Sequence, residues 1–136
     1  MSTTPHTIAD TLKGVPLTMS VVRTNHNPHM ADSADMDHWK CVLRCGENEM
    51  LVYFSKGYGH HGTRPALDEV LDCLASDASG IESAHSFDNW CSEYGYDTDS
   101  RKAEKTWRIC TEQAIRLQYL LGPALYKALL WNTERL

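Results

Sequence analysis

Long apolar runs are absent from this 136-residue sequence. A membrane-spanning helix needs roughly 18 or more consecutive apolar residues, whereas the most apolar stretch, residues 120–131, is interrupted by Gly122, Pro123 and Lys127. Residues 1–6 carry no Lys or Arg and lead into no apolar core of the kind that a secretory signal peptide has. The sequence therefore predicts a cytoplasmic protein that does not bind a membrane.

Signatures of a phosphate loop, of metal binding and of catalysis are absent as well. No Gly-Lys-Ser/Thr phosphate loop occurs. Cys41 and Cys45 are four residues apart on a predicted strand, about 13 Å along its axis, which is too far for both to bind one zinc ion. Asp97 and Asp99 resemble the start of a calcium loop, but Arg101 stands where the next oxygen ligand would be. We therefore expect no metal, no cofactor and no enzymatic activity.

A disulfide framework is also not expected. The five cysteines are odd in number and widely scattered, mostly at positions on predicted apolar faces. This pattern predicts reduced, buried thiols.

The first half of the sequence favours β-structure. Residues 1–16 contain little apolar material and are expected to form a loosely attached arm. β-Branched residues are frequent in residues 17–24. Apolar residues alternate with polar ones over residues 38–45, which places His38, Lys40 and Arg44 on the exposed face. A turn then leads to the apolar residues 50–55. These patterns predict about three antiparallel strands within residues 17–55.

The second half, residues 65–131, favours helices. Apolar residues recur at i, i+3, i+4 and i+7 in its first part, and Ser86 and Gly95 are favourable N- and C-terminal caps of a shorter helix. The apolar stripe of this shorter helix is Phe87, Trp90, Cys91 and Tyr94. Strands followed by helices predict one α+β domain, residues 1–136, with about three to four helices packed against one small antiparallel sheet. The helices are expected over residues 65–76, 87–94, 100–121 and 124–131.

Charge is distributed unevenly along the chain, whose net charge is −5. Residues 68–99 contain nine acidic residues and no Lys or Arg, whereas both signs are interspersed on an ordinary surface. This segment predicts an acidic face, which would repel nucleic acid and attract a basic partner. The alternative is a solvated pair of helices whose acids are partly neutralised by Arg101, Lys102, Lys105 and Arg108. The candidate partner-binding residues are Asp68, Glu69, Asp72, Asp88, Glu93, Asp97 and Asp99.

A second candidate site is the glycine-rich segment that contains His60 and His61. It lies between a predicted strand and the start of a helix, where free backbone N–H groups can bind an anion. One interpretation of this segment is a structural glycine-rich turn that binds no ligand. The functional interpretation is a small cytosolic enzyme or ligand-binding domain that uses the two histidines.

The sequence YGYDTDSRKA, residues 94–103, with Phe87 and Trp90 before it, resembles a family of small, mostly uncharacterised proteins encoded by bacteriophages and prophages. The resemblance extends over residues 70–117. It implies a mobile-element origin and the cytoplasm of an infected bacterium, and it assigns no catalytic residues. Two further segments are similar to the family, residues 39–41 and residues 59–62.

In that setting, a small acidic domain without a catalytic signature fits the type of phage anti-defence proteins, which includes anti-CRISPR proteins. We therefore expect a non-enzymatic interaction protein. Its acidic face would block a basic, nucleic-acid-binding surface of a host protein or ribonucleoprotein complex. The protein itself would bind neither nucleic acid nor a membrane.

Overall fold

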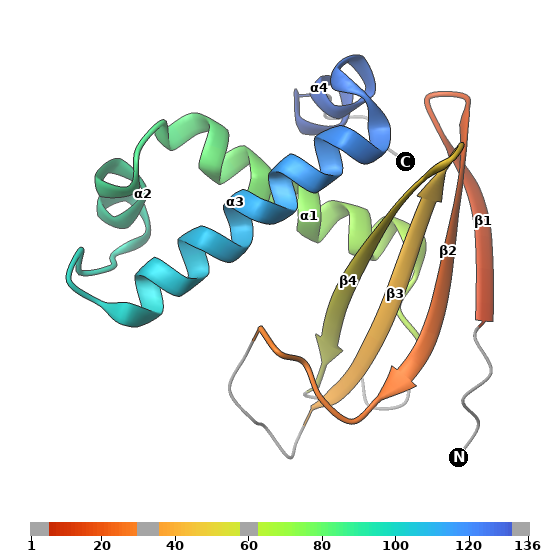
Figure 1. Ribbon diagram of the computed structural model, residues 1–136, viewed down its shortest axis with the longest axis horizontal. Helices are drawn as coiled ribbons and strands as arrows, with labels where there is room; N and C mark the ends of the chain where they lie inside the picture. Colours follow the sequence, from red (N-terminus) through yellow and green to blue (C-terminus); the bar gives the residue numbers. More distant parts are fainter. Residues whose placement is uncertain (1–5, 30–35, 58–62, 132–136) are drawn as a thin grey trace. The chain divides into compact units, whose positions relative to one another are not determined.

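A computed structural model describes residues 6–29, 36–57 and 63–131, and it has the expected α+β class (Figure 1). Contacts within the chain form two compact units, of which the first ends at Val70 and the second begins at Leu71, inside the first helix. The elements in chain order are β1 (His6–Leu12), β2 (Val15–Thr24), β3 (Asp37–Cys45), β4 (Asn48–Lys56), α1 (Leu67–Ala84), α2 (Phe87–Tyr94), α3 (Arg101–Leu121) and α4 (Pro123–Trp131).

The sheet is an antiparallel meander with the strand order β1-β2-β3-β4. The three expected strands are confirmed as β2, β3 and β4. In the β3–β4 pair, Cys41 lies opposite Val52 and Leu43 lies opposite Met50, and all four side chains are buried. Alternation of buried and exposed positions gives the sheet one apolar face, as the period of two predicts.

The sheet has four strands, one more than the predicted number of about three. Residues 6–12, which were expected in a loosely attached arm, form the edge strand β1 and pair along their whole length with β2. The sequence signal was weak because β1 is mostly exposed and only Leu12 is buried. Lys13 and Gly14 join the two strands with φ of 51° and 81°. Positive φ at both positions is typical of a type I′ hairpin turn, but Lys-Gly is not among its usual signals.

Helix α1 is longer than the predicted residues 65–76. It continues to Ala84 because small side chains extend its buried stripe, with Ala75, Ala78 and Gly80 inside. Helical periodicity is recognised from large apolar residues, so the predicted helix ended before this part of α1.

The two caps of α2 are confirmed. The Ser86 hydroxyl accepts a hydrogen bond of 3.2 Å from the backbone N–H of Asn89, and Gly95 ends the helix with φ of 75°. The core of this part of the second unit consists of Ala84, Trp90, Cys91 and Ala103 from α1, α2 and α3, with Trp107 partly buried against it. These contacts hold the three helices around the cavity described below.

Candidate functional site

The first group of predicted acidic residues lies at the start of α1. Asp68 and Asp72 are exposed on successive turns. Glu69 is used within the protein: its Oε2 lies 3.0 Å from Nζ of Lys56, whose side chain is only 10% exposed, and its Oε1 accepts a hydrogen bond from the backbone N–H of Ala66. Glu69 therefore holds the connection from β4 into α1, a role that the sequence did not indicate.

The second group, Asp88, Glu93, Asp97 and Asp99, lies on α2 and on the turn that follows it, and all four residues are exposed. We call these four residues the α2 acidic segment. Asp97 also shapes the turn, because its Oδ1 accepts a 3.1 Å hydrogen bond from the backbone N–H of Asp99. Burial raises the pKa of the Cys91 thiol, and the charges of Asp88 and Asp97 raise it further. These two carboxylates are therefore close enough to act on one sulfur atom.

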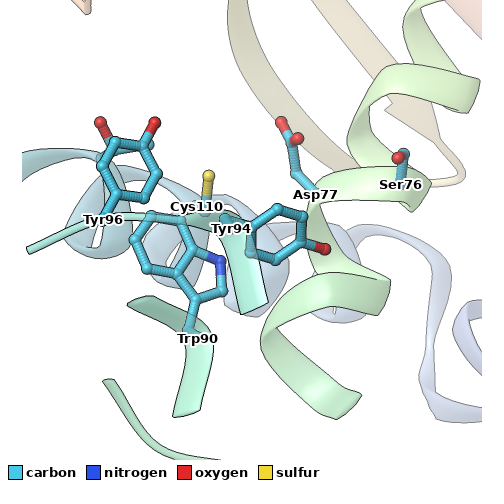
Figure 2. Close-up of a pocket in the computed structure, with 7 residues that line it drawn as sticks. Ser76, Asp77, Trp90, Tyr94, Tyr96 and Cys110 are labelled. Atoms are coloured by element: carbon cyan, nitrogen blue, oxygen red, sulfur yellow. The ribbon is translucent and has the colours of Figure 1, made fainter. Parts of the chain in front are cut away.

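A cavity of about 260 Å³ lies among α1, α2 and α3, within the second unit (Figure 2). Helix α1 contributes Ser76 and Asp77, and α2 contributes Trp90 and Tyr94. Within the described part of the chain, its lining contains one carboxylate and no Lys, Arg or His. The remaining lining residues are Tyr96, Thr106 and Cys110.

Aromatic rings form one side of this cavity. Trp90 stacks on Tyr96 with 5.1 Å between ring centroids and an interplanar angle of 9°, and Tyr94 lies 5.6 Å from Trp90. Trp107 supports the indole of Trp90 edge-on at 5.5 Å. A Cβ at Gly80 would lie 2.5 Å from the hydroxyl oxygen of Tyr94. The absence of a side chain at Gly80 therefore lets Tyr94 lie against α1.

Two ionisable groups in the lining, Asp77 and Cys110, have raised pKa values. Burial of its carboxyl raises the pKa of Asp77 above the usual value of 3.8. Burial raises the pKa of the Cys110 thiol to about 11, with a further contribution from the charge of Asp77. At neutral pH the Cys110 thiol in the lining is therefore neutral.

No local pattern in the sequence indicated this cavity. Asp77 was counted only as one acid in a long acidic segment, and Ser76 lay at the expected end of its helix. Trp90 and Tyr94 were assigned to an apolar stripe. The aromatic-rich sequence around α2 was the one available signal, and it pointed to a core.

A polar network in the first unit joins β3 to β4. Ser55 Oγ lies 2.7 Å from Nδ1 of His38, which is buried although its position on β3 predicted exposure. Asn27 donates a 3.0 Å hydrogen bond to the same Ser55 oxygen. A catalytic triad needs its third residue on the histidine instead. The network therefore satisfies buried polar groups and secures the end of the sheet.

His60 and His61 lie outside the described residues. Their segment, residues 57–62, has the G-x-G-x-x-G spacing of a dinucleotide-binding loop. That loop works at the end of a strand in a parallel βαβ unit. Here the preceding strand, β4, pairs antiparallel with β3 in a meander whose described strands are all antiparallel. The topology does not provide the setting that the dinucleotide loop requires.

Within residues 6–29, 36–57 and 63–131, no group of three or more His, Cys, Asp or Glu side chains could hold a metal ion. No helix in this part of the chain is long and apolar enough to cross a membrane. All five cysteines are thiols, and Cys73 is exposed, contrary to the expectation of burial.

No protein-family model, no curated protein and no solved structure matches the chain.

Proposed function

We propose that the protein is a phage-encoded interaction protein of the anti-CRISPR type, which acts in the host cytoplasm without catalysis. It blocks a basic, nucleic-acid-binding surface of a host defence complex. The observation that carries the proposal is the exposure of the whole α2 acidic segment. The proposed contact residues are Asp68, Asp72, Asp88, Glu93, Asp97 and Asp99.

Electrostatics gives the reason for a basic partner. Carboxylates that lie near one another raise the local negative potential, which speeds the encounter with a positively charged surface. The same potential repels nucleic-acid phosphates. A surface that normally binds those phosphates is rich in Arg and Lys, so it presents the complementary charge.

Glu69 is left out of the proposed contact set. Its carboxylate is engaged with Lys56 and with the backbone of Ala66. Release of Glu69 to a partner would leave the poorly exposed Lys56 ammonium without this ion pair, which is unfavourable.

The test is protection of a phage against a defence system. Bacteria that carry an active CRISPR system and express the protein are infected with a targeted phage, and plating efficiency is measured. The protein should restore plating. The variant Asp88→Lys, Glu93→Lys, Asp99→Lys should restore it at least tenfold less, because the segment becomes positive. Asp97 is kept because it shapes its turn.

A matched control has the same change in net charge elsewhere. Asp10, Glu47 and Glu112 are exposed acids outside the proposed contact set, and their joint replacement by Lys should leave protection unchanged. Both variants are purified first and their folding is checked by circular dichroism. Equal loss of protection in the two variants would contradict a specific role of the α2 acidic segment. The proposal is also wrong if the unaltered protein neither protects the phage nor binds the effector complex of any defence system tested.

A further inference from the structure

The cavity in the second unit has the chemistry of a cation site. One carboxylate, Asp77, lines this cavity together with the rings of Trp90, Tyr94 and Tyr96. The face of an aromatic ring carries negative electrostatic potential and attracts a cation within about 6 Å of its centroid. An anionic ligand would instead meet Asp77 with no basic residue in the lining to compensate.

The size of the cavity limits the ligand to one side-chain-sized group. Its volume of about 260 Å³ is below the roughly 300–1,000 Å³ of pockets for drug-sized ligands and cofactors. Tyr94 is 51% exposed and Asp77 is exposed, so the cavity is open to solvent. A group carried on a flexible chain can therefore enter it from outside.

Hydrogen-bonding groups in the lining favour a guanidinium. Thr106 donates its hydroxyl proton to the carbonyl of Lys102 at 2.8 Å, so its oxygen can only accept further hydrogen bonds. The carboxylate of Asp77 is also an acceptor and can receive two parallel N–H bonds. A guanidinium presents five N–H donors in one plane and stacks on aromatic rings, whereas an ammonium is a compact point charge.

We propose that this cavity binds the guanidinium group of an arginine side chain, with Asp77 as its ionic partner and Trp90, Tyr94 and Tyr96 as its walls. The source of the arginine rests on the proposed function, because a basic host surface would supply it. Recognition of the guanidinium rests on the cavity alone.

Titration of the full chain with N-acetyl-argininamide tests the proposal directly. Two-dimensional ¹H–¹⁵N NMR follows the Trp90 indole N–H and the backbone N–H groups of Tyr94 and Thr106. We expect saturable shifts at these three residues. N-acetyl-citrullinamide, which has nearly the same shape without the charge, should bind at least tenfold more weakly. N-acetyl-lysinamide should bind severalfold more weakly.

Variants test whether binding depends on the cavity or only on the negative charge of the protein. Asp77→Asn should weaken binding of N-acetyl-argininamide at least tenfold, whereas Glu112→Gln, an exposed acid on α3 outside the cavity, should change it less than twofold. Gly80→Ala provides a second, independent variant. Its new methyl group displaces Tyr94, but alanine favours a helix more than glycine does, so the protein should stay folded and bind more weakly.

Three results would overturn the guanidinium site. One is equal binding of the citrulline and arginine compounds, and another is unchanged binding by Asp77→Asn. The third is equal binding of the lysine compound, which would indicate a cation site without preference for a guanidinium.

Failure of this inference can be distinguished from failure of the proposed function. If the arginine compound does not bind but the protein still protects the phage through its acidic residues, the cavity assignment alone is wrong. If the arginine compound binds and no defence complex does, the proposed function is wrong and the cavity assignment stands.

Discussion

The protonation of Asp77 should make the stability of the protein depend on pH. Burial raises its pKa above 3.8 in the folded protein, so the folded state binds a proton more tightly than the unfolded state. The free energy of unfolding should therefore fall as the pH rises from about 3.8 through the raised pKa. Asp77→Asn removes this contribution. Urea unfolding at several pH values should show the unaltered protein losing stability relative to Asp77→Asn as the pH rises through this range.

A bound cation should reverse the shift, because an opposite charge favours the ionised carboxylate. The Asp77 carboxyl can be followed by ¹³C NMR during a pH titration with and without N-acetyl-argininamide. We expect a lower midpoint with the ligand present. An unchanged midpoint at saturating ligand would place the guanidinium away from Asp77.

The cysteines should differ strongly in reactivity. The thiolate is the reactive form, and burial raises the pKa of Cys41 to about 12 and that of Cys110 to about 11. Cys73 is exposed on α1. At pH 8, an alkylating reagent should modify Cys73 first, and Cys41, Cys91 and Cys110 only after unfolding. Mass spectrometry of peptides after timed alkylation measures this order. Rapid modification of Cys110 in the folded protein would show that the helices around the cavity open readily.

At the scale of elements, α2 depends on the residue that ends it. Gly95 has φ of 75° and nothing within 4 Å of the position that a Cβ would occupy. Gly95→Ala should therefore cost about 1–2 kcal/mol through backbone strain alone, and Gly95→Asn should cost less because asparagine tolerates this conformation. Ser92→Ala, at an exposed position of the same helix, is the control and should change stability by less than about 0.5 kcal/mol. Urea denaturation measures all three variants.

Elements whose patterns are local were predictable from the sequence. The alternation in β3 and the caps Ser86 and Gly95 each specify structure through a few neighbouring residues. The edge strand β1 was missed because it buries so little of its surface. The end of α1 was missed because alanines pack there in place of large apolar residues.

The cavity needed information that no local pattern contains. It forms where side chains from three helices meet, and the spacing of residues along one helix does not reveal which residues of another helix lie opposite. Trp90 illustrates the difficulty, since its position on α2 correctly predicted burial and yet said nothing about the empty volume beside it. The acidic residues could be counted from the sequence. Their partners could not be predicted in the same way, because the ion pair of Glu69 depends on where the fold places Lys56.

At the scale of the whole molecule, electrostatic attraction should set the rate at which the protein associates with a basic partner. The net charge is −5, and the α2 acidic segment concentrates part of it on exposed positions. Salt shortens the range of such interactions, from a Debye length of about 10 Å at 0.1 M to about 3 Å at 1 M. Binding to a defence complex should therefore become weaker with salt, mainly through slower association, whereas dissociation should change less.

The variant with Asp88, Glu93 and Asp99 replaced by Lys tests whether the α2 acidic segment causes this salt dependence. Reversal of three exposed charges should reduce the association rate at least tenfold at low salt and should flatten its salt dependence, because the attraction that salt screens is gone. Surface plasmon resonance at several salt concentrations measures both quantities against a defence complex that the unaltered protein binds. The control with Asp10, Glu47 and Glu112 replaced carries the same net charge, so a general charge effect would slow both variants equally. A salt dependence that is the same in the variant and the unaltered protein would mean that another surface attracts the partner.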